Sequence, residues 1–184
     1  MQTIYKAIFG LLLTLSFLDV SGQVTIPEPE YTGNIVYIDS GQARPLEKQK
    51  ASAKAKAGAS MYIVGVGKVK ASNVVTGMRS PVRTNQRDSL SFIVRVTDNN
   101  VDPFQLINIF KLEQNPNKNN RFIEVSNVGT FSGASANDIA FLSFDAKKYG
   151  ERSYMITIQK QLIPGEYAIT IEGSRELFNM FGVD

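Results

Sequence analysis

The chain has 184 residues, of which 43% are hydrophobic and 20% charged, and its formal net charge is +3. This is the composition of an ordinary globular protein. Histidine, cysteine and tryptophan are absent, which excludes disulfides, thiolate nucleophiles, imidazole-based catalytic triads and the usual zinc sites. Carboxylates, lysines, tyrosines and hydroxyls are what remains for chemistry. We therefore expect a protein that is not an enzyme and that holds no cofactor and no metal.

Residues 1–22 have the features of an export signal. Lys6 precedes an apolar run, Ala7–Leu18, of about 12 residues, whereas a membrane-spanning helix needs roughly 20. Val20 and Gly22 fit the small-residue positions before a signal peptidase cut, which we place after Gly22. An uncleaved anchor is the alternative. The predicted mature protein is periplasmic, at the cell surface or secreted, and it has no transmembrane segment.

We expect the mature chain to consist of a short N-terminal segment and one domain over residues 34–184. Residues 23–33 contain two prolines and little periodicity, so this segment is predicted to be extended. Asn34–Ile38 follows as a short strand, which ends at Asp39, Ser40 and Gly41.

Residues 44–58 are rich in lysine and alanine, and their signals conflict. Pro45 and Gly58 could frame a helix, because proline is favoured at a first helical position and glycine just after a helix ends. Lys54 and Lys56, however, alternate with alanines at period two, as in an edge strand protected by lysine. We favour extended structure for this segment.

Positive charge is concentrated in residues 44–87, which hold ten basic residues and one acid, Glu47. A block of this size can attract anionic polymers. The alternative is that its lysines only keep exposed strand edges soluble. A nucleic acid partner is not expected, because Tyr62 is the only aromatic residue of the block and a stacking platform is missing. The candidate residues for binding an anionic ligand are Lys48, Lys50, Lys54, Lys56, Arg79 and Arg83.

From Ser60 onward, short segments rich in β-branched and aromatic residues alternate with turn signals such as Asn73–Gly77. This pattern predicts an all-β protein, an antiparallel β-sandwich of about eight to ten short strands, since no helical crossovers are available for parallel pairing. The predicted core comprises Ile63, Val82, Phe92, Val94, Ile107, Ile109, Ile123, Leu142, Phe144, Tyr154, Ile156, Ile158, Tyr167, Ile169, Ile171 and Phe181.

The stretch LIPGEYAITIEG, residues 162–173, predicts the central strand. Pro164 and Gly165 suit a type II turn, after which apolar residues at 167, 169 and 171 alternate with a polar face. Leu162, Pro164, Gly165 and Tyr167 together resemble the LxPGxY tyrosine corner of immunoglobulin and fibronectin type III sandwiches. The resemblance implies an immunoglobulin-like architecture in which the tyrosine hydroxyl bonds to upstream backbone.

The whole mature chain also resembles a set of uncharacterised exported or envelope-associated bacterial β-sandwich proteins. The resemblance is carried by PLEKQ, GMRSPVR, FIVRV, IFKLE, NNRFIEV, KKYGERSYMITI, LIPGEYAI and the ending FGVD. It implies one β-rich domain and transfers no catalytic or ligand residue. Many of these proteins have a cysteine just before FGVD, where this chain has Asn179 and Met180, so a role for a thiol there is not expected.

Some polar and charged side chains are spaced in the sequence as they are in known kinds of site. Asp98, Asn100 and Asp102 alternate as in the start of a calcium loop, but Pro103 stands where such a loop has glycine, and we interpret the stretch as a surface turn. Arg95 is expected on the solvated face of its strand. The same outward direction is predicted for Glu113, Glu124, Glu166 and Glu172.

The hypothesis favoured by the sequence is a non-catalytic structural or protein-interaction module of the bacterial cell envelope. It predicts an exposed apolar patch or an open sheet edge. The alternative is a binding module for an anionic glycan or another envelope polymer, which requires the basic residues of 44–87 to converge on one face. A carboxylate enzyme would require two acids in one cleft.

Overall fold

The protein is described by a computed structural model over residues 26–57, 68–85, 89–129, 133–136, 139–174 and 176–184. These residues form fourteen β-strands, a four-residue helix and one 3-10 turn. The strands make two sheets, of five and nine strands, in which one pairing, β6 with β14, is parallel and the others are antiparallel. The all-β prediction is confirmed, but the expected number of strands was too low. The export signal lies outside the described residues.

The five-stranded sheet has the order β11-β12-β7-β1-β2. The two strands that come first in the sequence, β1 and β2, form a hairpin through Ser40 and Gly41. Both turn residues have positive φ, +50° and +79°, as a type I′ turn requires. The strands are β1 (Ile35–Asp39), β2 (Gln42–Pro45), β7 (Leu90–Arg95), β11 (Asp145–Tyr149) and β12 (Ser153–Ile158).

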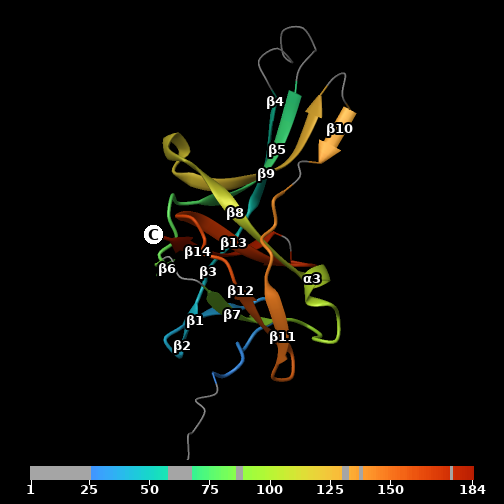
Figure 1. The fold of residues 1–184 in the computed structure, drawn as a ribbon. Helices are drawn as coiled ribbons and strands as arrows, with labels where there is room; N and C mark the ends of the chain where they lie inside the picture. Colours follow the sequence, from blue (N-terminus) through green and yellow to red (C-terminus); the bar gives the residue numbers. More distant parts are fainter. Residues whose placement is uncertain (1–25, 58–67, 86–88, 130–132, 137–138, 175) are drawn as a thin grey trace, which may run out of the picture.

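The nine-stranded sheet follows the path β3-β14-β13-β8-β9-β5-β4, with β10 added on β9 and β6 on β14. In Figure 1, strands β4, β5, β9 and β10 extend beyond the part where the two sheets pack. The elements are β3 (Glu47–Lys50), β4 (Ser52–Ala57), β5 (Lys68–Thr76), β6 (Arg83–Thr84), α3 (Pro103–Leu106), β8 (Ile107–Asn115), η1 (Pro116–Lys118), β9 (Asn120–Gly129), β10 (Gly133–Ala136), β13 (Gly165–Ile171) and β14 (Leu177–Val183).

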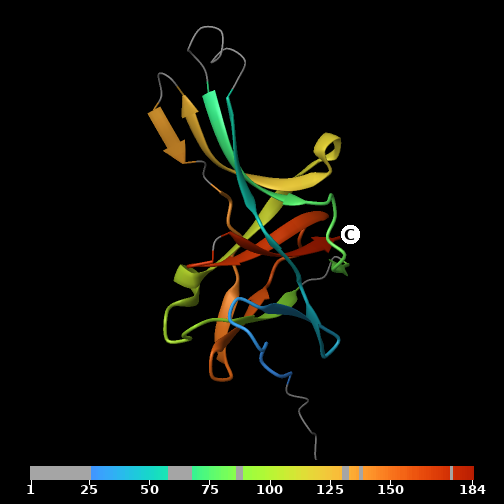
Figure 2. The same cartoon turned by 180° about the vertical axis from the view of Figure 1, so that it is seen from behind.

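This larger sheet curls, because the two ends of its path are consecutive parts of one chain segment. β3 pairs with β14 and β4 pairs with β5, and only Ala51 lies between them, where its N–H donates to the carbonyl oxygen of Glu176 at 2.7 Å. Figure 2 shows this nearly continuous strand crossing the back of the molecule. The lysine- and alanine-rich segment is therefore extended, and Pro45 ends β2 instead of starting a helix.

The main core lies between the two sheets and agrees closely with the predicted set. Val82 and Leu142 pack against it while partly buried, Ile123 belongs to a second cluster, and Ile63 lies outside the described residues. The buried members are Ile35, Tyr37, Leu46, Leu90, Phe92, Val94, Val96, Ile107, Ile109, Phe144, Tyr154, Ile156, Ile158, Leu162, Tyr167, Ile169, Ile171, Phe181 and Val183.

A second apolar cluster lies on the other side of β13 and β14, inside the curl. The sequence prediction that β13 has one polar, solvated face was wrong, because Glu166, Ala168 and Thr170 are all buried there. A strand covered on both sides cannot be recognised from alternation alone. The cluster consists of Ala51, Val75, Phe110, Leu112, Ile123, Ala168, Phe178 and Met180.

Tyr167 lies in β13 with its ring stacked on Phe181 at a centroid distance of 5.5 Å. Its hydroxyl donates to the carbonyl oxygen of Ile163 at 2.7 Å, which is the upstream backbone bond that the motif implied. The predicted type II turn is absent, since Gly165 has φ +155° where that turn needs about +80°. Glycine still suits this position, because L side chains rarely adopt this φ, whereas the contact of a Cβ with Cε of Lys111, at 2.5 Å, could be relieved by movement of that flexible side chain.

Other predicted boundaries also shifted. The turn expected over Asn73–Gly77 is mostly strand, because β5 continues to Thr76 in pairing with β9 and only Gly77 turns, at φ +82°. The IAFLSFD stretch contributes a single bridge, Phe141 to Phe110, and the charged DAKKY sequence after it forms β11 instead. In each case pairing with a neighbouring strand outweighed local residue preference.

The N-terminal segment is fixed to the five-stranded sheet by Glu28. Its carboxylate accepts hydrogen bonds from Nη1 of Arg95 at 2.7 Å, from Oγ of Ser153 at 2.5 Å and from the backbone N–H groups of Glu151 and Arg152. Partial burial opposes ionisation, yet these bonds and the Arg95 charge lower the pKa of Glu28 to about 2. Arg95 is thus paired and four-fifths buried, and its predicted position on the solvated face was wrong.

This anchor predicts a pH-dependent stability. The pKa of Glu28 is lower in the folded chain than its ordinary 4.5, so its contribution is complete above that pH and is lost as the pH falls towards 2. We expect Glu28→Gln to lower the urea midpoint at neutral pH and to have no effect near pH 2. Glu30→Gln, at an exposed position two residues away, is the control. An equal loss at both pH values would contradict this role.

Candidate functional site

The six candidate anion-binding residues do not form one surface. Lys48 donates to Oδ1 of Asn34 at 2.7 Å, and Lys50 pairs with Glu176 at 3.2 Å. Arg79 and Arg83 bind acidic groups near the end of the chain. Lys54 and Lys56 lie apart from these and line a hollow on the curled sheet. The basic residues of 44–87 thus do not converge as one block, as the anionic-polymer hypothesis required, and among the described residues of that block only Lys54, Lys56 and Lys70 line a common hollow. The structure separates charges that are paired from lysines that are available to a ligand.

Arg79 and Arg83 belong to a group of charges that also contains Arg121, whose side chain is fully buried at the start of β9. Its Nη1 donates to Glu47 at 3.0 Å and to Glu166 at 3.2 Å, and its Nη2 donates to Glu47 at 2.9 Å. The remaining bonds go to the carbonyl oxygens of Gly77 and Thr76. All three guanidinium nitrogens are thus satisfied, as a buried charge requires.

Glu166 joins this arginine to a second one. Its Oε1 accepts from Nη1 of Arg83, and its Oε2 accepts from the backbone N–H of Ser80 at 2.7 Å as well as from Arg121. The side chain of Glu166 is only 1% exposed, so its predicted outward direction was wrong. Apolar neighbours at 167 and 169 gave no sign that residue 166 faces a buried partner. We call Glu47, Arg79, Arg83, Arg121, Glu166 and Asp184 the ionic cluster.

Asp184 completes the ionic cluster by accepting from two arginines. Nη2 of Arg79 lies 2.6 Å from Oδ1, and Arg83 donates to both carboxylate oxygens. Hydrogen bonds and charge from Arg83 and Arg79 lower the pKa of Asp184, and the same bonds raise the pKa of Arg83. Gly182 makes room for this arrangement, because a Cβ there would lie 1.6 Å from Nη1 of Arg83.

The ionic cluster draws its members from five separate stretches, namely PLEKQ, GMRSPVR, NNRFIEV, LIPGEYAI and FGVD. These stretches are far apart in the sequence and meet here. Each buried charge has its partner within the cluster, so the arrangement closes the interior of the curled sheet and leaves no buried cation for a ligand.

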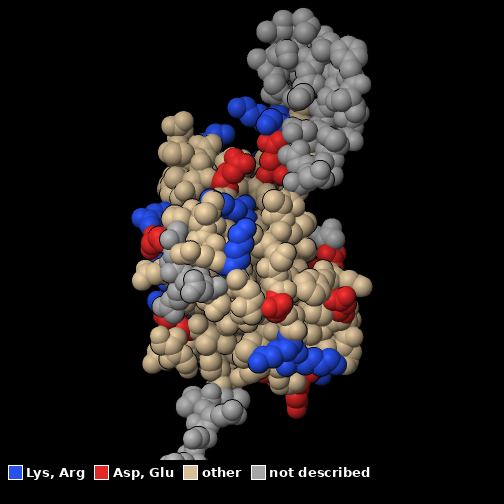
Figure 3. Space-filling model, in the orientation of Figure 1, with Lys and Arg blue, Asp and Glu red and all other residues tan. Residues whose placement is uncertain are grey.

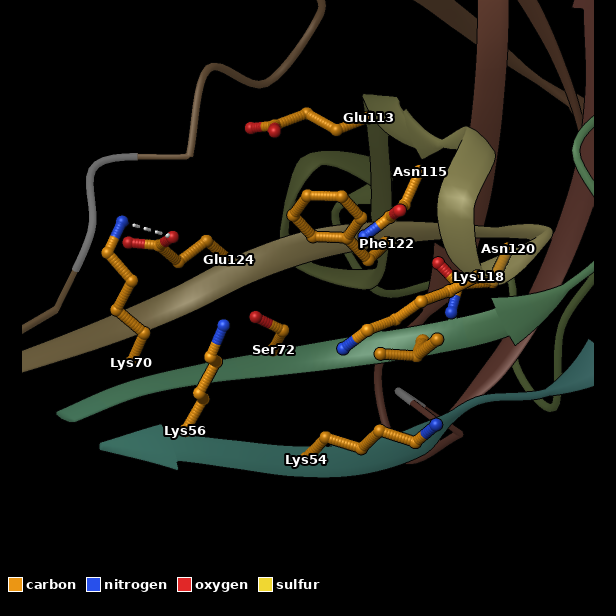
Figure 4. A pocket seen from close by; sticks show the side chains of 11 residues that line it. Lys54, Lys56, Lys70, Ser72, Glu113, Asn115, Lys118, Asn120, Phe122 and Glu124 are labelled. Atoms are coloured by element: carbon orange, nitrogen blue, oxygen red, sulfur yellow. Dashed lines mark hydrogen bonds and ion pairs between the residues drawn. The ribbon is translucent and has the colours of Figure 1, made fainter. Parts of the chain in front are cut away.

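The available lysines line a hollow of about 340 Å³ on the face shared by β4, β5, β9 and β8. Figure 4 shows the ring of Phe122 in the middle of this face, with lysine side chains around it. We call it the basic hollow; its lining is Lys54, Lys56, Lys70, Ser72, Val74, Glu113, Asn115, Lys118, Asn120, Phe122 and Glu124.

Strand register explains why these residues meet. Lys54 pairs with Ser72, and Lys56 with Lys70, across β4 and β5. Glu124 then follows Ser72 across β5 and β9. Residues that are directly opposite on neighbouring strands share a face, so the hollow is a patch of cross-strand neighbours.

Of the eleven residues that line the basic hollow, only Lys54 and Lys56 were among the candidates from the sequence. Phe122 alternates with the inward residue Ile123 and therefore lies on the outer face of β9, and Lys118 comes from the η1 turn between β8 and β9. The alternation in RFIEV was a usable signal for Phe122. No pattern in the sequence places Lys118 beside β4, because this contact depends on the curl of the sheet.

The basic hollow has more cations than acids. Lys70 pairs with Glu124 at 2.9 Å, whereas Lys54, Lys56 and Lys118 have no hydrogen-bond or ion-pair partner among the described residues. Figure 3 shows basic and acidic side chains side by side at this end of the molecule. Four lysines and two glutamates make the hollow positive, with ammonium groups available to an anion.

Two carboxylates, Glu113 and Glu124, share the basic hollow, which is a feature that a carboxylate enzyme would need. Glu113 is exposed to solvent and Glu124 is paired with Lys70. Neither has the apolar surroundings that a catalytic general acid occupies. Their oxygens can accept hydrogen bonds from ligand hydroxyl groups.

The calcium-like stretch forms local structure. Oδ1 of Asp98 accepts from the backbone and side chain of Asn100 at 3.0 and 2.8 Å, and Asp102 caps α3 by accepting from Phe104 N at 2.9 Å. Over the described ranges, no three acidic, histidine or cysteine side chains gather closely enough to hold a metal ion. In the same part of the chain, no helix has the length and apolar character to cross a membrane.

Comparisons of the chain with models of protein families, with curated proteins and with solved structures gave no match. The function must therefore be inferred from the geometry of this chain itself.

Proposed function

We propose that this protein is a non-catalytic binding module that holds an anionic glycan in the basic hollow. The observation that supports this proposal most directly is the convergence of Lys54, Lys56, Lys70 and Lys118 around Phe122. An aromatic ring gives a sugar ring an apolar surface to rest on, while ammonium groups attract a carboxylate or phosphate.

The remaining lining suits a sugar better than a simple polyanion. Asn115, Asn120 and Ser72 offer amide and hydroxyl groups, and Glu113 accepts hydrogen bonds. A plain polyphosphate could use the lysines but has no hydroxyl groups to donate to these acceptors. A uronic acid or a phosphorylated sugar can use both the cations and the acceptors of the basic hollow.

A structural or protein-interaction role is the second candidate. The five-stranded sheet ends in β2 and β11, whose outer edges have no pairing strand among the described residues, and every residue of β2 is exposed. An extended peptide can add to such an edge. β2 is only four residues long and ends in Pro45, which limits the pairing it can offer, so we rank this role second.

The cellular place of the protein and its relation to immunoglobulin-like folds belong to the same proposal. Export through residues 1–22 would bring the basic hollow to the cell envelope, where anionic glycans are found. The hydrogen bond between Tyr167 and Ile163 and the packing of two sheets support an immunoglobulin-like relationship, although the curled sheet adds strands to that plan.

The glycan proposal predicts that the paired substitution Lys54→Gln with Lys56→Gln weakens binding to polygalacturonate by about tenfold or more, because each close ion pair in water contributes about 1 kcal/mol. Affinity should also fall as salt rises from about 0.05 to about 0.5 M, since exposed charges are screened. Isothermal titration calorimetry of the purified protein measures both effects.

The matched control removes the same amount of charge elsewhere. Lys147→Gln with Lys160→Gln changes two exposed lysines outside the basic hollow and should leave the affinity unchanged. Neutral dextran should not compete. If the control pair weakened binding as much as the Lys54 and Lys56 pair, the attraction would be nonspecific and the proposal would fail.

A further inference from the structure

The interior of the curled sheet has two different ends. Along β13, Glu166 lies in the ionic cluster, Ala168 is fully buried in the second apolar cluster, and Thr170 lines a hollow at the far end. Along β9, Arg121 lies at the same end as Glu166, and Val125 lies at the far end with Thr170. One end of the interior is therefore closed by paired charges, and the other is open.

The open end is a hollow of about 470 Å³, which we call the apolar hollow. Its size lies within the range of about 300–1,000 Å³ that is usual for small-molecule sites. Phe141 stands in its wall and is 54% exposed. The lining is Asn73, Asn108, Phe110, Ile123, Val125, Ile139, Phe141, Thr170 and Phe178.

The hollow is accessible because β8 and β9 separate. They pair only from Glu113 with Phe122 to Asn115 with Asn120. N-terminal to Glu113, one edge of β8 pairs with β13. Among the described residues, its other edge has only the bridge between Phe110 and Phe141 and a hydrogen bond from Leu142 N to Ile109 O at 2.8 Å.

A third hollow, of about 560 Å³, lies between the two already described. It shares Lys70, Glu113 and Glu124 with the basic hollow, and Phe110, Ile123 and Ile139 with the apolar hollow. The three hollows together make a surface that starts at the ammonium groups on the outer face of β9, passes the gap where β8 and β9 separate, and reaches the aromatic and aliphatic walls of the interior.

We propose that the ligand of this surface is an acylated anionic glycan, with its sugar in the basic hollow and its acyl chain in the apolar hollow. This inference rests on the proposed function and adds the chemical class of the ligand. Burial of the acyl chain is favourable because it removes apolar surface of the ligand and of the protein from water.

The distribution of charge separates this ligand from a free fatty acid. The connecting hollow holds two lysines, Lys70 and Lys111, and two glutamates, Glu113 and Glu124, so the charges balance where the acyl chain would leave the apolar wall. The excess positive charge lies farther out, at Lys54, Lys56 and Lys118. A ligand with a sugar between its acyl chain and its anionic group can span the distance from the apolar wall to these outer lysines. A fatty acid, whose carboxylate is attached directly to the acyl chain, cannot.

Calorimetric titrations of the full protein with three probes separate the contribution of the acyl chain from that of the anionic sugar. The probes are dodecyl glucuronide, dodecyl maltoside, which has a neutral head group, and glucuronate, which has no acyl chain. The two dodecyl compounds are used below their critical micelle concentrations. We expect dodecyl glucuronide to bind at least about tenfold more tightly than glucuronate, because two buried methylene groups already account for that factor. It should also bind at least about tenfold more tightly than dodecyl maltoside, because only the glucuronide has a carboxylate for the lysines, and each close ion pair contributes about 1 kcal/mol. Laurate should bind no better than dodecyl maltoside.

Two variants locate the two parts of the ligand. Val125→Trp fills the apolar hollow and should reduce dodecyl glucuronide binding to the level of glucuronate, while polygalacturonate binding is retained. Lys54→Gln with Lys56→Gln should reduce dodecyl glucuronide binding to the level of dodecyl maltoside. Ile139→Trp, on the same wall, replaces Val125→Trp if circular dichroism shows that the latter does not fold.

The outcomes are distinguishable. If filling the hollow leaves dodecyl glucuronide affinity unchanged, or if affinity does not rise from octyl to dodecyl chains in the unaltered protein, the acyl site is wrong even when polygalacturonate binds. If the lysine pair has no effect on polygalacturonate or dodecyl glucuronide, the glycan proposal itself fails.

Discussion

Replacement of Arg121 by methionine is expected to be the most damaging single change in the described part of the chain, with a loss of about 3–5 kcal/mol in the free energy of unfolding. The methionine has similar length but leaves Glu47 without its guanidinium partner and takes one of two arginines from Glu166. Chemical denaturation in urea, followed by far-ultraviolet circular dichroism, measures the difference.

Arg44→Met is the matched control, because Arg44 pairs with Asp39 at 3.1 Å on the surface. An exposed pair of this kind contributes about 0–1 kcal/mol. Similar losses for the two variants would show that Arg121 does not carry an energetically distinct buried pair. Partial recovery in the double variant Arg121→Met with Glu47→Gln, which neutralises the carboxylate left without its arginine, would identify unpaired charge as the source of the loss.

Gly182→Ala is the second change for which we expect a large effect, about 1–3 kcal/mol, the usual cost of forcing atoms into occupied space. The new methyl group would lie 1.6 Å from Nη1 and 2.3 Å from Cζ of Arg83, and 2.9 Å from Oε1 of Glu166. The arginine must move away, which breaks its bonds to Glu166 and Asp184. Thermal and urea unfolding of the variant report the loss.

A double-mutant cycle with Arg83→Ala tests this explanation. Once the guanidinium group is removed, the alanine methyl group has space, so Gly182→Ala should cost much less in that background than in the unaltered protein. Additive losses would contradict the steric account and would point to a backbone requirement at residue 182.

The parts of the fold that were predictable are those in which one sheet face meets the main core. Ile156, Ile158, Ile169 and Ile171 alternate with less apolar neighbours, and their burial follows directly from that period. The alternation of lysine and alanine before Gly58 likewise indicated a strand. The period of apolar residues along a strand indicates which of its faces is buried, and for these segments that information was enough to predict the strand and its core residues.

The second layer was not predictable in this way. Glu166 and Thr170 occupy positions that look solvated in the sequence, yet the curl of the larger sheet covers them. The burial of Glu166 depends on Arg121, which lies 45 residues away in the chain, and single-strand patterns carry no information about such a partner. The same limit applies to Lys118 in the basic hollow.

The nearly continuous strand formed by β3 and β4 couples stability to recognition. Glu47 in its first half holds Arg121, and Lys54 and Lys56 in its second half face the proposed ligand. Glu47 and these lysines are separated by only a few residues of backbone. Loss of order around Glu47 would therefore displace the lysines through the backbone itself, without any side-chain contact between them. Evolution of ligand preference in this protein is then constrained by residues that no ligand ever touches.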